Sequence, residues 1–117
     1  MNNKDLDLGA DGSLTTGNAM MNNDGVLVDD GTGSRTSVGA GAITVAGAGN
    51  SITVDAGAGT MEGLSNRDLD AADFGTTGRA ATEEQLELVN QTASAGWNVT
   101  DADGNSANIG PNGQVSF

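Results

Sequence analysis

Very short apolar segments, each preceded by a glycine-containing turn, constrain this sequence more than any other feature. In residues 1–62 such turns precede four segments, at 13–15, 26–28, 42–45 and 51–54. Asp-Gly and Gly-Asn turns followed by alternating or β-branched residues are typical of short strands joined by tight turns. The sequence therefore predicts an all-β region whose strands carry too few large side chains to pack a two-layer sandwich without other chains.

A shortage of bulky side chains leads to the same conclusion. The 117 residues include 19 glycines but only two phenylalanines, one tryptophan and no tyrosine. A single domain of this length has to bury roughly two thirds of its unfolded surface to be stable alone. Each ordered residue costs about 1–2 kcal/mol of backbone entropy, and glycine costs the most. The composition therefore indicates either an interior shared with partner chains or disorder.

The charge and the missing residue types argue against several functions. Sixteen acidic and four basic residues give a net charge of −12, which repels nucleic acid phosphates and anionic membranes. No apolar run approaches the roughly 20 residues that cross a bilayer, and residues 1–5 are not of signal-peptide type. The sequence has no cysteine and no histidine, so it offers no disulfide or thiol chemistry and no imidazole for base catalysis or metal binding. We expect no enzyme, no cofactor, no metal site, no nucleic acid partner and no membrane insertion by this fragment.

One helix is predicted, from Thr82 to about Ala93. Thr82 can cap its start, Gln85 can return the hydrogen bond, and two glutamates follow the cap in the first turn, where the helix dipole favours them. Leu86, Val89 and Ala93 then form a narrow coiled-coil seam. An isolated helix of about three turns is only marginally stable in water, so its stability has to come from packing against copies of itself. The seam fits a trimer and leaves a dimer open.

The sequence predicts strands again after Gly96. The expected strands are 97–100, 107–109 and 114–117, with turns at 101–105 and 111–113. Trp97 opens this region directly after the helix, so its copies in a parallel trimer would meet near the axis.

Three motifs resemble trimeric autotransporter adhesins, proteins of type V secretion. They are Gly63-Leu64-Ser65-Asn66, the run from Phe74 to Leu86 that contains Ala80-Ala81-Thr82-Glu83-Glu84-Gln85, and Gly96-Trp97-Asn98-Val99. In that family the first closes a β head, the second opens a coiled-coil neck, and the third begins a head with a ring of tryptophans. All three occur here in the family's order, and the insert 67–78 resembles longer neck variants.

The resemblance implies an intertwined homotrimeric β-prism fibre with a short coiled-coil neck helix. Its regions would be β-prism-like strands at 1–62, the neck at 63–95 and the start of a tryptophan-ring head at 96–117. It implies structural roles in the trimer core and neck for Gly63, Leu64, Asn66, Phe74, Gly75, Gly78, Thr82, Gln85, Leu86, Val89 and Trp97.

For the whole protein the resemblance implies an adhesin at the bacterial cell surface. It would attach to host cells or extracellular-matrix proteins and self-associate. Its anchor in the outer membrane would be a C-terminal region absent from this fragment.

Calcium binding is the main alternative. Asp101–Asn105 alternates oxygen side chains before a glycine, but the glycine and glutamate of a full calcium loop are missing, so we interpret it as a hairpin turn. Residues 47–61 faintly resemble the glycine-rich repeats of a secreted calcium-binding β-roll, without keeping the nonapeptide period. A largely disordered acidic linker is a third hypothesis.

Two other patterns have structural explanations. Asp70, Asp73, Glu83 and Glu84 could supply a glycosidase-like carboxylate pair, but nothing apolar surrounds them to raise a pKa. Gly75 to Gly78 before the helix could cradle an anion, but the glutamates in the first turn would repel it. We interpret the glycines as turn formers.

Overall fold

The fold was obtained as a computed structural model that describes residues 6–116. Residues 1–5, at the start of the expected N-terminal region, and Phe117, in the expected last strand, lie outside the described residues. The chain divides into two compact units, Met1–Ser65 and Asn66–Phe117. It is mainly β with one short helix, as the sequence predicts. No helix in the described part is long and apolar enough to cross a membrane.

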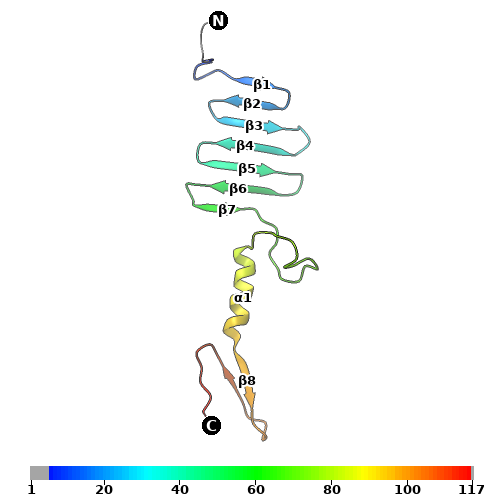
Figure 1. Cartoon of the computed structure of the whole chain (residues 1–117), viewed down its shortest axis with the longest axis vertical. Coiled ribbons are helices and arrows are strands. Elements are labelled where there is room, and N and C mark those ends of the chain that lie inside the picture. Colours follow the sequence, from blue (N-terminus) through cyan, green and yellow to red (C-terminus); the bar gives the residue numbers. More distant parts are fainter. Residues whose placement is uncertain (1–5, 117) are drawn as a thin grey trace. The chain divides into compact units, whose positions relative to one another are not determined.

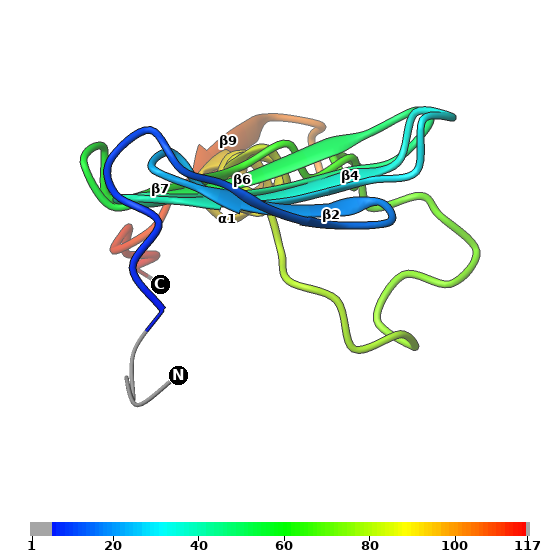
Figure 2. The same ribbon diagram turned by 90° about the horizontal axis from the view of Figure 1, so that it is seen from above.

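The first unit is a single antiparallel sheet. Its seven strands follow one another in chain order, each paired with its sequence neighbours. They are β1 (Leu14–Thr16), β2 (Ala19–Asn22), β3 (Gly25–Asp29), β4 (Arg35–Gly39), β5 (Ala42–Ala46), β6 (Ser51–Asp55) and β7 (Thr60–Glu62). Figure 1 shows this meander, and Figure 2 shows that its strands form one layer.

Four of these strands confirm the sequence prediction, and three were missed. The predicted segments lie within β3, β5 and β6 and overlap β1 at residues 14–15, whereas β2, β4 and β7 had no strand signal. β2 reads Ala-Met-Met-Asn and β7 reads Thr-Met-Glu, so neither has the β-branched, alternating pattern of a strand. They are strands because a two-residue turn or a short loop returns the chain to an open sheet edge.

The register places unlike side chains on the two faces of the sheet. Val26 pairs with Val38, Val38 with Ile43, and Ile43 with Val54, so these four side chains share one face. The same face continues to Leu14 and Met21 at one end and to Met61 at the other. The opposite face carries Ser37, Thr44 and Thr53 at its centre. The sheet is therefore amphipathic.

The second unit contains helix α1 (Glu83–Ala95) and a hairpin of strands β8 (Trp97–Thr100) and β9 (Ser106–Ile109). Thr82 is the N-cap, and the predicted capping box with Gln85 is present. At the other end Gly96 has φ +72°, and a Cβ there would collide with the Ile109 carbonyl oxygen. Only glycine fits where the helix turns into β8.

The expected strand at 114–117 is wrong for residues 114–116, which form no strand. The Gly113 N–H donates to the Gly110 carbonyl at 2.9 Å, and this turn ends the pairing with the hairpin. Residues 114–116 then have no partner strand within the described chain. Val115 instead lines a shallow depression with Val99 and Ile109 of the hairpin.

A hydrophobic core is missing from the described part of the chain. None of its hydrophobic side chains is buried, and its one buried residue is Gln85, which is 6% exposed. Buried apolar area is the main stabilising contribution to a folded domain. The fold of a single copy therefore lacks the interior that its amphipathic sheet could form.

Candidate apolar interfaces and the neck knot

The most extensive candidate interface is the apolar side of the sheet. We call the line of directly paired side chains across its seven strands the apolar row: Leu14, Met21, Val26, Val38, Ile43, Val54 and Met61. Their exposed fractions lie between 38% and 57%. A continuous apolar stripe of this length is typical of an interaction surface.

The reverse side of the sheet carries Met20 and Leu27 at one end, but its centre is polar and yet less exposed. Thr44 and Thr53 lie opposite each other with their hydroxyl oxygens 3.3 Å apart, and both are half-buried. Their neighbours Ile43 and Val54, in the apolar row, are 44% and 40% exposed. A single chain therefore leaves its apolar side chains more open to water than its hydroxyls.

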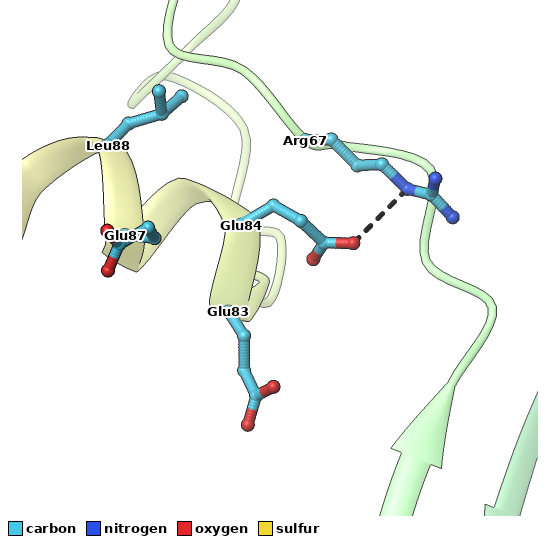
Figure 3. Close-up of a pocket in the computed structure, with 5 residues that line it drawn as sticks. All are labelled: Arg67, Glu83, Glu84, Glu87 and Leu88. Atoms are coloured by element: carbon cyan, nitrogen blue, oxygen red, sulfur yellow. Dashed lines mark ion pairs between the residues drawn. The ribbon is translucent and has the colours of Figure 1, made fainter.

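Helix α1 repeats this arrangement. Leu86 and Val89 of the predicted seam are 67% and 49% exposed, while Glu87 accepts hydrogen bonds from Asn90 and Gln91 along another side. Leu88 lies away from the seam in a shallow depression beside the first turns of the helix, where Arg67 pairs with Glu84 at 3.5 Å (Figure 3). The seam residues contact no core within the described chain.

The hairpin has the same two-sided character. Trp97 pairs with Ile109, and Val99 with Ala107, which places these apolar side chains on one face. Trp97 is 60% exposed. The other face carries Asn98, which accepts a 3.0 Å hydrogen bond from Asn108. The Asn108 amide also donates to the Ala95 carbonyl at 3.0 Å and so caps the last turn of α1. No pattern in the sequence predicted this role of Asn108.

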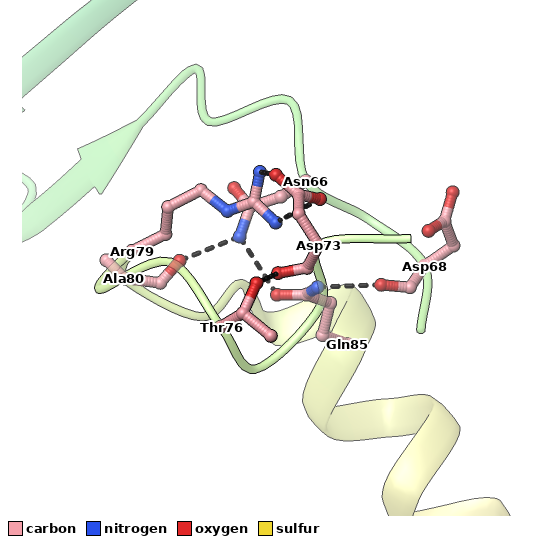
Figure 4. A network of polar contacts seen from close by, with 7 residues as sticks. All are labelled: Asn66, Asp68, Asp73, Thr76, Arg79, Ala80 and Gln85. Carbon is pink, nitrogen blue, oxygen red and sulfur yellow. Dashed lines mark hydrogen bonds and ion pairs between the residues drawn. The ribbon is translucent and has the colours of Figure 1, made fainter. Parts of the chain in front are cut away.

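Three predicted neck residues come together in one hydrogen-bonded cluster, which we call the neck knot: Asn66, Thr82 and Gln85. The Asn66 amide donates to the Ala80 carbonyl at 2.7 Å and to Gln85 Oε1 at 3.0 Å (Figure 4). The Thr82 hydroxyl donates to the Asn66 carbonyl at 2.7 Å. Gln85 Nε2 donates to the Asp68 carbonyl at 2.7 Å. No buried side-chain polar atom in the described part lacks a partner.

The insert 67–78 forms an exposed loop that extends from the neck knot. Arg79 holds it with two hydrogen bonds to Asp73, each 3.0 Å long (Figure 4). This guanidinium lowers the pKa of Asp73 below its ordinary value. Phe74 is 46% exposed, and Gly75 has φ +75°. A Cβ at Gly78 would meet nothing within 4 Å, so the geometry does not require glycine there.

Gly63 and Leu64 lie between β7 and the neck knot. Gly63 has φ +92°, and a Cβ there would collide with the Ser51 carbonyl oxygen of β6. Glycine is therefore required at this exit from the sheet. Leu64 is half-buried.

Many aspartates cap turns, which explains their abundance. In Asp101–Asn105, Asp101 Oδ1 accepts from the N–H groups of Asp103 and Asn105, both at 2.9 Å, and Oδ2 accepts from the Asn105 amide at 2.8 Å. These hydrogen bonds, the Asn105 amide first, lower the pKa of Asp101. The loop after Asp30 has the same form, with its carboxylate bound to Thr32 and Ser34. The turn interpretation of residues 101–105 is confirmed.

The other alternative patterns also have structural explanations. Residues 47–61 contain β6 and the first two residues of β7, which pair antiparallel, unlike the parallel coils of a calcium-binding β-roll. Asp73 and Glu84 pair with different arginines, Arg79 and Arg67. The two carboxylates therefore do not form a pair with each other.

A comparison with known proteins supports the resemblance found in the motifs. Over 46 residues, 39% of this chain, the sequence is 54% identical to the trimeric autotransporter adhesin AtaA of Acinetobacter sp. (strain Tol 5). The chain covers 1% of the length of that protein. No protein-family model matches the chain, and no solved structure matches it. The similarity supports a stalk or head segment of such an adhesin.

Proposed function

We propose that this chain is a structural stalk or head segment of a bacterial surface fibre in which three parallel copies share one interior. The observation that carries the proposal is the position of its apolar side chains. The apolar row, the helix seam and Trp97 are all exposed in a single chain, and no described hydrophobic side chain is buried. Three copies that turn these faces toward a common axis would bury all of them.

The energy available from this burial is large. Each of the seven side chains in the apolar row keeps roughly half of its surface exposed. Burying the remainder contributes about 1 kcal/mol for each, or about 7 kcal/mol per chain. That is comparable to the whole stability of an ordinary domain, about 5–15 kcal/mol. Folding and assembly would therefore be one event. The number three comes from the resemblance, because the row alone fits any closed arrangement of amphipathic sheets.

The proposed regions have distinct mechanical roles. The strands of 1–62 form one wall of a β-prism, the neck at 63–95 leads into a coiled coil along Leu86 and Val89, and the segment 96–117 opens a second β head at Trp97. The neck knot fixes the start of α1 and so sets which side of the helix carries the seam. The segment spaces binding surfaces away from the outer membrane and is not an enzyme.

Attachment and self-association belong to the proposal for the whole protein. The full-length protein would be anchored in the outer membrane by a C-terminal region, and it would bind host-cell or extracellular-matrix proteins. The net charge of −12 would keep neighbouring fibres soluble and would disfavour nucleic acid as a partner.

Sedimentation equilibrium between about 0.5 and 50 μM tests the assembly. We expect the mass of three chains, together with a melting temperature that rises with protein concentration. The fluorescence of Trp97, the sole tryptophan, should shift to shorter wavelength in the assembled state. Chelation of calcium should change neither signal. A folded monomer with a water-exposed indole would refute the proposal, and a monomer that unfolds on chelation would favour the β-roll instead.

A further inference from the structure

The neck knot joins two points of the chain that are far apart in sequence. Asn66 and Thr82 are 16 residues apart, and one hydrogen bond of 2.7 Å links them. Asp68 and Gln85 are 17 residues apart and are linked by another of the same length. The insert and the residues after it form a loop that these hydrogen bonds close. The two ends of the loop are therefore connected in two ways, directly through the hydrogen bonds and over a longer distance through the covalent backbone of the loop.

From this geometry we propose that the neck knot is a mechanical latch that stores the insert as reserve length and releases it under tension. A force that pulls residue 65 away from helix α1 acts on the hydrogen bonds of the knot first, because the backbone of the insert is not extended. The knot therefore bears the force until its hydrogen bonds break, after which the insert straightens. The biological use of this release rests on the proposed function as a load-bearing fibre.

The knot is better shielded from water than the insert that it closes. Gln85 is 6% exposed and uses its side chain in both directions, accepting from Asn66 and donating to Asp68. Water competes poorly for buried hydrogen bonds, so these hold until the knot opens as a whole.

The insert offers little resistance once it is free. Every residue from 71 to 79 is exposed, and the hydrogen bonds of this stretch stay within it. Its strongest contact is the pair of hydrogen bonds from Arg79 to Asp73, which lies at the surface, where solvent screening weakens an ion pair, and which joins two residues within the insert and its end without linking them to the knot. Rupture of the knot should therefore appear as one abrupt lengthening and not as a series of steps.

The released length follows from the residue count. An extended chain spans roughly 3.3–3.6 Å per residue, so the 16 positions from Asn66 to Thr82 reach about 55 Å. Subtracting the few ångströms that separate these residues in the closed knot leaves a gain of about 50 Å per chain. A fibre could yield by this length at its neck before its coiled coil or its sheets unfold.

Optical tweezers can test the latch on the full chain. The sequence has no cysteine, so Ser65→Cys and Ser94→Cys give two unique attachment points on either side of the knot and the helix. Refolding the labelled chain with an excess of unlabelled chain leaves at most one labelled copy in each assembly. We expect a single step of about 50 Å before α1 unravels. A trace without such a step would refute the latch.

Two variants identify the origin of the step. Deleting residues 70–77 keeps Asn66, Thr82 and Gln85 and should shorten the step by roughly 28 Å, whereas an unchanged step would mean that the length comes from elsewhere. Asn66→Ala removes both side-chain donations into the knot and should lower the release force. Gln91→Ala, which removes one exposed hydrogen bond to Glu87, is the matched control and should release at the parent force. Equal forces in Asn66→Ala and the parent would overturn the proposal.

Sedimentation of the same samples separates the two proposals. A trimer without the step would refute the latch and leave the fibre intact. A monomer with the step would refute the trimer and keep the latch as a property of the chain.

Discussion

Ile43→Asp, compared with Thr44→Asp, provides the sharpest test of the shared interior. The two positions are adjacent in the middle of β5 and point to opposite sides of the sheet. Both variants add the same charge at nearly the same place, so effects of net charge and strand propensity largely cancel. Only the face that receives the carboxylate differs.

Which of the two variants is the less stable depends on whether the chain is assembled or folds alone. Ile43 is 44% exposed in one copy, whereas Thr44 is half-buried and shares a contact with Thr53. A chain that folds alone should therefore tolerate aspartate at 43 at least as well as at 44. In an assembly that covers the apolar row, aspartate at 43 loses about 1.5–3 kcal/mol of burial and adds an unpaired buried carboxylate, which costs roughly 3–5 kcal/mol.

We therefore expect Ile43→Asp to destabilise the assembly by about 5 kcal/mol or more per chain, enough to prevent it from forming at micromolar concentration. Thr44→Asp should lose about 1 kcal/mol through its hydroxyl contact and remain assembled. Sedimentation equilibrium and thermal denaturation at several concentrations measure both. If Thr44→Asp proves as damaging as Ile43→Asp, or if Ile43→Asp assembles with an unchanged melting temperature, the apolar row is not an interior surface.

Three further predictions concern the neck and the loops. Gln85→Ala should lower the free energy of unfolding by about 1–3 kcal/mol because it leaves buried partners unsatisfied, whereas Gln91→Ala should change it by less than about 0.5 kcal/mol in the same denaturation assay. Gly63→Ala should cost about 1–3 kcal/mol or more because of its positive φ and the clash with β6, and Gly78→Ala should be tolerated; equal melting temperatures would contradict this geometry. The lowered pKa of Asp101 means that its loop is fully stabilised above the unfolded value of about 3.9 and loses this contribution as pH falls through the lower folded value. The protection of the amides in residues 101–105, measured relative to the intrinsic exchange rate at each pH, should fall below about pH 4 in the parent, and Asp101→Asn should abolish that dependence of the protection on pH.

Much of the chain follows from interactions between near neighbours, and these the sequence predicted. The capping box of Thr82 and Gln85 forms as its spacing requires, because both partners lie within one helical turn. The turn at Asp101 and strand β8 lie at the expected residues for the same reason. These elements depend on hydrogen bonds and backbone preferences of residues that are close together in the sequence, so a short segment is enough to predict them.

Other features needed contacts between distant residues. β4 begins Arg-Thr-Ser and carries no strand signal, yet it pairs on both sides with β3 and β5. The capping box predicted one role for Gln85, but its bonds to Asn66 and to the Asp68 carbonyl span 19 and 17 residues. Sequence spacing cannot show such partners, because the insert between them has no pattern that fixes its path.

The sequence by itself determined the local elements, the excess of turn-capping aspartates and the shortage of bulky side chains. Only the tertiary structure decided that seven large apolar residues, one from each strand, line up on one face of the sheet. That alignment depends on the register of every strand pair, and a shift of one residue in any pair would move the following side chains to the other face. Register is a property of the whole ladder, set by the accumulated pairing energy of all its strands, and no single segment encodes it.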